Sequence, residues 1–386
     1  TWTMAFWIKR AKLDTTQYML TFSTASGLAI NASNQLYFYN GTAYTSTAVY
    51  RDTGAWMHVA IVCTSGSADF YINGTQVTDG GFSSSLTCAA VGTLNIGYWS
   101  FDSLYYYNGY MADIYFVEGS AVTPTGNFIN DPATDTNGQL KPKAYTVSGT
   151  NSFHLDFKDS ADLGNDAAGS NDFAESGLVA SDQMNDRPTN NYCVLNPLDD
   201  ASGSALSEGN LKVVGSSTQA HLGATMNMPT SLKWYWEVYQ SDTTLLEEGM
   251  TYEGKQLVTD GIGIYSTSVY VANTAVVTGI TRTAGDIIQF AVDSATGKVW
   301  VGQNNTWFNS GNPSTGANPI ATITTPTIGE WQIQVWPVTA TATRIYNFGA
   351  DPTFGGLESA ATSEFKYTPP TDFLALSTAN LPTPTI

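Results

Sequence analysis

The amino-acid sequence predicts an all-β protein made of two antiparallel β-sandwich domains joined by a loop-rich connector. Apolar and polar residues alternate with a period near two in most informative windows, and these windows are rich in Thr, Tyr, Val, Ile and Trp. No window has the spacing of an amphipathic helix. Because a half-buried strand has one apolar face that a second sheet must cover, we expect one sandwich from residues 1–120 and another from residues 191–386.

The first domain is predicted to open with a strand over residues 2–8, whose apolar side chains fall on one face. The same alternation predicts a strand over residues 56–63. The clearest local signal is in residues 70–77, where Asn73 and Gly74 stand between two strand-like runs. The Asn-Gly pair tolerates positive φ at both central positions of a tight turn, so we predict a β-hairpin there.

The chain changes character between the two domains. Residues 121–190 are dense in Pro, Asp, Asn, Gly and Ser, which predicts a connector of loops with at most short strands, such as residues 153–157. Strand patterns resume in the second domain, which ends in a Pro-rich tail. They cover residues 210–214, 233–239, 261–265, 287–293, 298–301, 331–336 and 344–348. Short strands separated by turn residues are typical of sandwiches and barrels.

Composition excludes several classes of protein. The 386 residues include 15 Lys and Arg against 33 Asp and Glu, a formal net charge of −18, which argues against nucleic acid as a partner. Hydrophobic residues make up 42% and aromatic residues 12%, which argues against a disordered chain. The apolar runs are far shorter than the roughly 20 residues that a membrane-spanning helix needs.

Cysteine use predicts buried, reduced thiols rather than a disulfide framework or a zinc site. The three cysteines, Cys63, Cys88 and Cys193, are odd in number and include no CxxC pair. Cys63 and Cys88 both lie in apolar runs, where a free cysteine behaves as a small hydrophobic residue. A bridge between Cys63 and Cys88 is the open alternative.

Five motifs make the first half resemble the laminin-G-like, or concanavalin A-like, jelly-roll family. They are FWIKR at residues 6–10, WMHVA at 56–60, FYING at 70–74, LNIG at 94–97 and YNGYMADIY at 107–115. The resemblance implies a jelly-roll sandwich. In that family a further strand precedes the one that opens here. The resemblance therefore implies that Thr1 is an internal point of a longer chain, or that another segment supplies the strand.

The second half resembles the SPRY family, which also has a β-sandwich fold. The matching motifs are WYWEV at residues 234–238, GIGI at 261–264, GDII at 285–288, TGKVW at 296–300, NNTW at 304–307 and NFG at 347–349. Two departures stand out. Asn304-Asn305 replaces the usual Asn-Gly, and residues 243–254 look like an insertion.

The pairing of the two domains is similar to virion-surface proteins of tailed bacteriophages, especially marine ones. The connector motif LGND at residues 163–166 and the terminal LPTPT at 381–385 add to this similarity. The resemblance implies an extracellular tail fibre, appendage or capsid decoration on the virion surface. It implies partners that are host-surface glycans or neighbouring virion proteins, and a homo-oligomer such as a trimer.

Catalytic motifs were sought and the sequence favours a protein that is not an enzyme. A glycosidase needs two carboxylates that flank one bond, and no E-x-D-x-x-E strand is present. Glu247 and Glu248 are adjacent, so on a strand they point to opposite faces. Neither HExxH nor GxSxG occurs, and His58 is expected to be structural. We expect no cofactor, with Ca²⁺ as the exception considered below.

Two aromatic segments are the candidate sites for a glycan or protein partner. Sugars present C–H faces to aromatic rings, and Tyr and Trp also provide a polar group. The first segment contributes Tyr98, Trp99, Phe101, Asp102, Tyr105, Tyr106, Tyr107, Asn108 and Tyr110. The second, a loop over residues 304–318, contributes Trp307, Phe308, Asn309 and Asn312. The alternative is that part of these rings fills the core.

The acidic part of the connector is the candidate for a metal. Asp156, Asp159, Asp162 and Asp166 supply oxygen ligands of the kind that Ca²⁺ prefers. Their spacing does not fit an EF-hand, and solvated turns explain the same residues.

Three functions follow as hypotheses. The first is a non-catalytic virion surface protein that binds host glycans or neighbouring virion proteins. The second is a purely structural assembly protein whose aromatic loops are covered by other subunits. The third is a secreted bacterial adhesin or a module of a carbohydrate-active enzyme.

Overall fold

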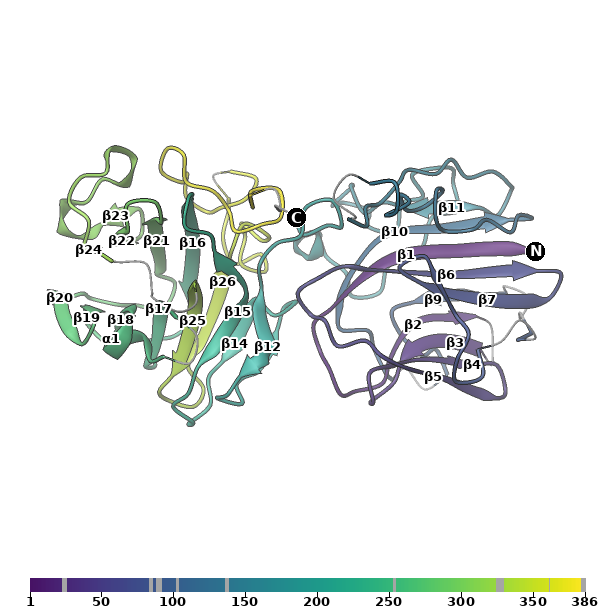
Figure 1. Cartoon of the computed structure of the whole chain (residues 1–386), viewed down its shortest axis with the longest axis horizontal. Coiled ribbons are helices and arrows are strands. Elements are labelled where there is room, and N and C mark those ends of the chain that lie inside the picture. The colour runs from purple at the N-terminus through teal and green to yellow at the C-terminus, as the bar shows by residue number, and fades with distance from the viewer. Residues whose placement is uncertain are drawn as a thin grey trace. The chain divides into compact units, whose positions relative to one another are not determined.

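The computed structural model describes residues 1–22, 26–82, 86–87, 92–101, 104–135, 139–252, 255–323, 330–360 and 362–382 (Figure 1). The chain divides into two compact units; unit 1 comprises Thr1–Gln183, and unit 2 begins at Met184. Each unit contains two antiparallel sheets, which confirms the predicted all-β class. No helix in the described ranges is long and apolar enough to cross a membrane.

Unit 1 is a sandwich of a six-stranded and a five-stranded sheet. The six-stranded sheet has the order β11-β10-β1-β6-β7-β8, and the five-stranded sheet has the order β5-β4-β3-β2-β9. The strands are β1 (Trp2–Arg10), β2 (Gln17–Phe22), β3 (Ser26–Ile30), β4 (Gln35–Tyr39), β5 (Ala43–Val49), β6 (Met57–Thr64), β7 (Ser67–Ile72), β8 (Thr75–Val77), β9 (Leu94–Ile96), β10 (Gly109–Glu118) and β11 (Phe153–Leu155).

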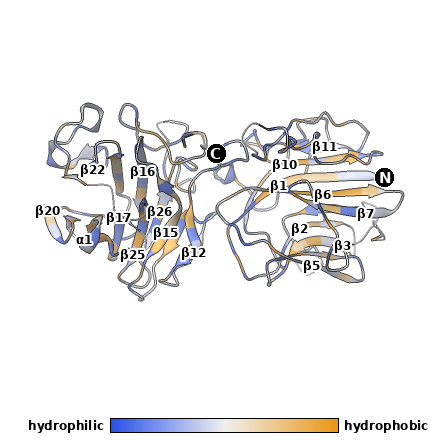
Figure 2. Ribbon diagram, in the orientation of Figure 1, coloured by the Kyte–Doolittle hydropathy of each residue, from blue (hydrophilic) through white to orange (hydrophobic). Residues whose placement is uncertain are grey.

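The core of unit 1 lies between its two sheets. Alternate residues of β1, namely Trp2, Met4, Phe6 and Ile8, point into it, as their spacing predicts. Figure 2 shows that strongly hydrophobic residues gather in strands such as β6. The predicted hairpin joins β7 to β8, and its turn residues have positive φ, 50° at Asn73 and 79° at Gly74.

The cysteines correct one prediction and confirm another. Cys63, at the end of β6, is disulfide-bonded, so the prediction of a reduced thiol is wrong at this position. Cys193 is a buried free cysteine, as predicted. Cys88 lies outside the described residues. Burial in an apolar run is equally compatible with a thiol and a bridge, so the sequence around Cys63 does not distinguish them.

The segment predicted as a connector forms much of the outer layer of unit 1. β11 pairs with β10, which adds a sixth strand to the sheet. Phe128 is 1% exposed and packs on the outer face of this sheet, with its ring centroid 5.3 Å from that of Tyr115 and 4.7 Å from that of Tyr145. The outer face of the six-stranded sheet is therefore apolar and covered.

Unit 2 is a sandwich of a seven-stranded and an eight-stranded sheet. The orders are β12-β15-β25-β17-β18-β19-β20 and β13-β14-β26-β16-β21-β22-β23, with β24 paired to β22. The elements are β12 (Leu195–Asp200), β13 (Ala205–Ser207), β14 (Lys212–Val214), β15 (Leu222–Met228), β16 (Lys233–Gln240), β17 (Leu246–Tyr252), α1 (Leu257–Asp260), β18 (Ile262–Tyr265), β19 (Ser268–Val271), β20 (Thr274–Thr278), β21 (Ile287–Asp293), β22 (Lys298–Gln303), β23 (Thr306–Trp307), β24 (Ala321–Thr322), β25 (Trp331–Pro337) and β26 (Thr343–Asn347).

The residues that look like an insertion form a central strand. β17 lies between β25 and β18 in the seven-stranded sheet. Glu248 of β17 is fully buried, where it accepts two hydrogen bonds from Arg282 Nη2 (2.8 and 2.9 Å) and one from Arg344 Nε. Removing either arginine would take away part of the hydrogen bonding of a buried carboxylate, which is costly. Residues 246–252 of the segment that looks like an insertion are therefore a buried strand of the sandwich.

The C-terminal segment covers the outer face of the eight-stranded sheet. Phe365 is fully buried, and its ring centroid is 4.8 Å from that of Tyr235 on β16. The neighbouring carboxylate of Glu237 accepts the backbone N–H groups of Lys366 and Tyr367, each at 2.9 Å. The tail thus forms an outer layer of unit 2.

Candidate binding surface

A segment between β9 and β10 lies along the outer face of the five-stranded sheet of unit 1. We call residues 97–101 and 104–108 the arm. The backbone N–H of Tyr18 donates to Tyr105 O at 2.9 Å, and Thr21 Oγ1 donates to Tyr98 O at 2.6 Å. Because both contacts involve β2, the arm is held against this strand. The aromatic residues of the arm therefore meet those that point outward from the sheet.

Trp99 is at the centre of these rings. It lies over Gly27 of β3, where a Cβ atom would come within 2.9 Å of Trp99 Cζ3. The centroid of the Trp99 ring is 4.4 Å from that of Tyr18, 4.7 Å from that of Phe101 and 6.2 Å from that of Tyr39. These separations are in the range of favourable aromatic contacts. A side chain at Gly27 would displace the indole from its place.

The outer rings of this group are exposed to solvent. Tyr106 is 61% exposed, and Phe101 and Tyr105 are each 47% exposed. Tyr98 and Tyr106 stack with centroids 5.8 Å apart and planes 20° apart. Contiguous exposed apolar groups of this kind mark interaction sites. We call the following rings the ring surface: Tyr18, Tyr37, Tyr39, Tyr98, Trp99, Phe101, Tyr105 and Tyr106.

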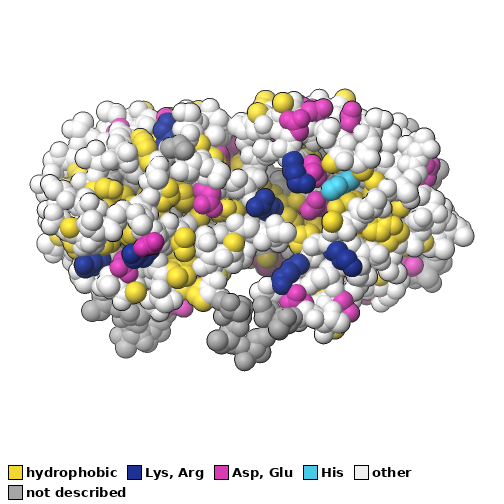
Figure 3. Space-filling view, turned by 90° about the horizontal axis from the view of Figure 1, so that it is seen from above, with side chains coloured by type: hydrophobic (Ala, Val, Ile, Leu, Met, Phe, Trp, Pro, Cys, Tyr) yellow, Lys and Arg dark blue, Asp and Glu magenta, His cyan; other side chains and the backbone are white. Residues whose placement is uncertain are grey.

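The sheet beneath the ring surface is uncharged. β2, β3, β4, β5 and β9 contain no Asp, Glu, Lys, Arg or His. Burial raises the pKa of Tyr37, and its neighbour Tyr39 raises it further. The face of the molecule seen in Figure 3, by contrast, shows acidic and basic side chains at several places among the apolar ones. The ring surface therefore offers aromatic faces and phenolic hydroxyls to a ligand.

Several residues predicted for the binding site are not part of the ring surface. The Tyr107 ring packs on the core and its hydroxyl donates to Lys9 O at 3.1 Å, and burial raises the pKa of Tyr107 well above its ordinary value. Tyr110 is 9% exposed and lies on β10, with Lys9 Nζ 5.7 Å from its ring centroid. Asn108 is exposed, and its backbone carbonyl accepts from Ala11 N. Asp102 lies outside the described residues.

Three members of the ring surface were not predicted from the sequence. Tyr18, Tyr37 and Tyr39 are on β2 and β4, where the core-facing residues are their neighbours in sequence. Their alternation with core residues such as Phe38 was a usable signal that they point outward. The sequence did not show that the arm lies above these three tyrosines.

In the second predicted segment, the aromatic side chains pack on the core of unit 2 rather than facing solvent. Trp307 and Phe308 are partly buried and pack on the core of unit 2, and the Trp307 ring is 6.4 Å from that of Tyr235. Asn309 is exposed with a φ of 56°. Asn312 is also exposed, but its side chain accepts from the N–H of Thr315 as a helix cap. The two rings thus lie under the loop, whereas the asparagines shape it.

The four carboxylates predicted to bind Ca²⁺ do not converge. Asp156 and Asp159 each accept the backbone N–H two residues further along, at 3.1 and 2.9 Å. Asp166 is 3% exposed and accepts His154 N at 2.9 Å. The carbonyl of Asp162 accepts a turn hydrogen bond. Among the described residues, no group of three or more His, Cys, Asp or Glu is placed to hold a metal ion.

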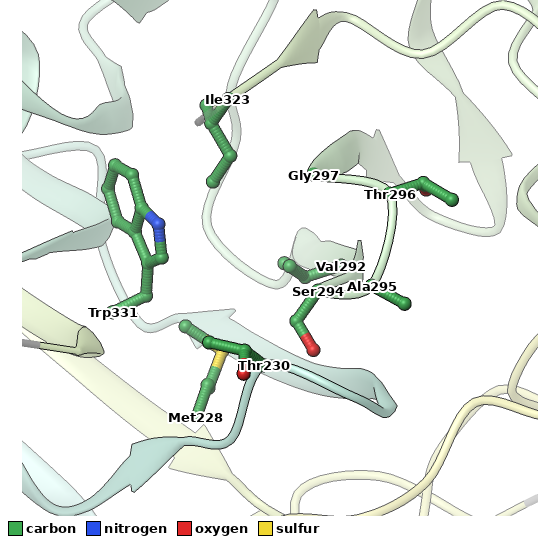
Figure 4. Close-up of a pocket in the computed structure, with 9 residues that line it drawn as sticks. All are labelled: Met228, Thr230, Val292, Ser294, Ala295, Thr296, Gly297, Ile323 and Trp331. Atoms are coloured by element: carbon green, nitrogen blue, oxygen red, sulfur yellow. The ribbon is translucent and has the colours of Figure 1, made fainter. Parts of the chain in front are cut away.

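A small pocket opens at one end of the sandwich in unit 2. It has a volume of about 240 Å³ and lies between Met228, Val292, Ile323 and Trp331, with the turn at Ser294 on one side (Figure 4). This is below the roughly 300–1,000 Å³ of pockets that enclose a small organic ligand. The Ser294 hydroxyl is already engaged with backbone carbonyls. The ring surface is the better candidate for binding.

Comparison with known proteins gives one family match. Residues 1–125 match the concanavalin A-like lectin/glucanases superfamily. This region contains β1 to β10 and the arm, and it ends before β11. No curated protein matches the chain.

The chain is also similar to solved structures at low sequence identity. The SPRY domain of human HERC1 is 15% identical, with a TM-score of 0.32, covering 41% of this chain and 97% of that chain. A putative carbohydrate-binding protein from Bacteroides ovatus is 16% identical, with a TM-score of 0.29, covering 40% and 48%. Domain 4 of AbnA, an extracellular arabinanase from Geobacillus stearothermophilus, in complex with arabinotriose, is 19% identical, with a TM-score of 0.25, covering 32% and 62%.

Proposed function

We propose that unit 1 is a carbohydrate-binding module whose ligand lies on the ring surface. The observation that carries this proposal is a contiguous set of aromatic rings on an uncharged sheet face, the outermost of which are about half exposed. The C–H faces of sugar rings pack on aromatic faces, while sugar hydroxyls pair with phenolic hydroxyls such as that of Tyr106. The match of residues 1–125 to a superfamily of lectins and glucanases supports the same function.

The test removes exposed rings that contribute little to the core. Phe101→Ser and Tyr106→Ser are each expected to lower the affinity for a bound polysaccharide by roughly threefold to tenfold, the value of one aromatic contact. The matched control is Leu357→Ser in unit 2, because Leu357 is 55% exposed and lies outside the ring surface. A glycan array first identifies the ligand, and affinity electrophoresis then measures each variant.

The outcomes separate the ring surface from other sites. Loss of affinity in both ring variants, with the Leu357 control unchanged, supports the proposal. Equal affinity in all of them would show that glycans bind elsewhere. An array without a hit would remove the carbohydrate-binding function.

We propose that binding occurs without catalysis. Hydrolysis of a glycosidic bond requires two carboxyl groups about 5–9.5 Å apart on either side of the bond. The strands under the ring surface contain no Asp or Glu. In unit 2, Glu247 and Glu248 point to opposite faces of β17, and Glu248 is paired with arginines. Release of reducing ends from a polysaccharide that binds would contradict this proposal.

We also propose that the glycan belongs to a host cell and that the protein is displayed on a phage virion. This step rests on the resemblance of the paired domains to virion-surface proteins. Several copies on one particle would raise the avidity of a weak site by about 10²–10⁴. Purified protein is then expected to compete with virions for adsorption. If the assembled particle covers the ring surface with other subunits, the protein has a structural role instead.

A further inference from the structure

The elements that form the ring surface carry almost no charge. Its five strands have no ionisable side chain other than tyrosine. Between residues 97 and 108 the sequence contains a single charged residue, Asp102, which lies outside the described residues. An anionic ligand would find no cation among these elements. The whole chain, with a net charge of −18, adds a long-range repulsion of anions.

The nearest cations in sequence are engaged elsewhere or lie beyond the strands. Arg10 is 2% exposed, and its guanidinium donates to Asn34 Oδ1 at 3.0 Å and to the carbonyl of Tyr50 at 2.6 Å. Lys9 is fully buried against Tyr110 on the other sheet. Lys12 and Arg51 are exposed, in the loops before β2 and after β5.

The rings themselves discriminate by charge. The face of an aromatic ring carries partial negative charge, so it attracts the weakly positive C–H groups of a sugar and repels a carboxylate or sulfate. A charged group that loses water against such a face without gaining a partner costs far more than a hydroxyl that gains one. Exposed phenols such as those of Tyr105 and Tyr106 both donate and accept hydrogen bonds, which suits neutral hydroxyls.

We infer that the ring surface selects uncharged saccharides and rejects sulfated and uronic-acid-containing ones. The inference rests on the proposed function and names the ligand class of the same site. It predicts that the wild-type protein binds a neutral galactan at least about tenfold more tightly than the sulfated form of the same galactan. A neutral glucan and its carboxymethyl derivative form a second matched pair. The factor is that expected when a charged group is desolvated without a partner.

A pair of variants tests whether the site or the whole-chain charge is responsible. Leu104→Lys places a cation in the arm, at a side chain that is 53% exposed. Leu357→Lys makes the same change in unit 2, where the side chain is 55% exposed. Both variants change the net charge equally. We expect Leu104→Lys to raise the affinity for the sulfated galactan by about twofold to fivefold, the value of one exposed ion pair, and Leu357→Lys to leave it unchanged.

Affinity electrophoresis at 0.1 M and 1 M salt completes the test. Long-range repulsion is screened at 1 M salt, where the Debye length is about 3 Å, so selectivity that persists there comes from the site. Preference for the neutral polymer in both pairs, with a gain only in Leu104→Lys, supports the inference. Equal or tighter binding of the sulfated polymer by the wild type would overturn it and leave carbohydrate binding intact. Absence of binding to any of the four polymers and to every neutral saccharide on the array would overturn both.

Discussion

Replacing His58 is expected to make the free energy of unfolding of unit 1 less sensitive to acid. His58 lies on β6 opposite Trp7 of β1, with the two ring centroids 5.2 Å apart and the planes at 70°. The histidine is 1% exposed, and its Nδ1 has no hydrogen-bond partner among the described residues. Burial lowers the pKa of His58 from 6.5 to about 3. The folded state therefore keeps the imidazole neutral at pH values where the unfolded chain binds a proton.

The size of the effect follows from linkage. The pKa of His58 is lower in the folded state than in the unfolded chain. The stability that the neutral imidazole contributes is therefore fully present above pH 6.5 and is lost as the pH falls toward 3. Each pH unit between these limits costs about 1.4 kcal/mol, so at pH 4.5 the free energy of unfolding of unit 1 is about 3 kcal/mol lower than at pH 7. His58→Phe keeps an aromatic ring next to Trp7 and abolishes this contribution.

The assay measures the urea dependence of unfolding at pH 7 and pH 4.5 in the intact chain. Hydrogen-exchange mass spectrometry reports peptides from β1 and β6 separately from those of unit 2. His221→Phe is the control, because His221 is in unit 2 and 23% of its side chain is exposed. We expect a smaller pH dependence in His58→Phe alone. The same pH dependence in the wild type and His58→Phe would refute the reasoning.

Three further changes have defined outcomes. Burial raises the pKa of Glu247 to about 7, so ionisation costs stability as the pH rises above 4.5. Glu247→Gln is thus expected to stabilise unit 2 by up to about 3 kcal/mol at pH 8 and not at pH 4, measured by urea unfolding. Gly27→Ala is expected to lower both the glycan affinity and the stability of unit 1, since the new Cβ would lie 2.9 Å from Trp99 Cζ3, from Tyr18 Cδ1 and from the backbone oxygen of Leu20. Arg344→Met is expected to destabilise unit 2 by about 1.5–3 kcal/mol, because it removes the hydrogen bond that Arg344 Nε donates to the buried Glu248, which keeps its two bonds from Arg282; unfolding within about 0.5 kcal/mol of the wild type would contradict that.

The strands that follow the alternating pattern could be predicted, whereas β17 could not. Its sequence places Glu247, Glu248 and Gly249 in the middle of a sheet, where the pattern favours apolar residues. The burial of Glu248 is possible because Arg282 and Arg344 reach it from 34 and 96 residues away in sequence. A local window contains neither arginine, so the strand looks like a polar loop.

Only part of the candidate site could be predicted, and the reason is similar. The density of rings between Tyr98 and Tyr110 indicated an aromatic site, but it did not show which rings leave the core. That depends on the path of the arm, which is fixed by contacts with β2 such as Tyr18 N to Tyr105 O. Tyr107, near the end of the arm, packs on the core, whereas Tyr18 contributes to the ring surface from a strand about 80 residues earlier.

The outer faces of the two sheets of unit 1 are covered by different kinds of residues. The difference indicates whether the exposed rings serve binding or folding. The six-stranded sheet is covered by buried residues such as Phe128. The five-stranded sheet is covered by the arm, whose outermost ring, Tyr106, stacks on Tyr98 and remains 61% exposed. If the rings only covered the sheet, Tyr106→Ser would cost stability. A surface substitution outside the core changes stability by no more than about 0.5 kcal/mol. Loss of glycan affinity at unchanged stability in this variant would therefore assign the ring to binding rather than to folding.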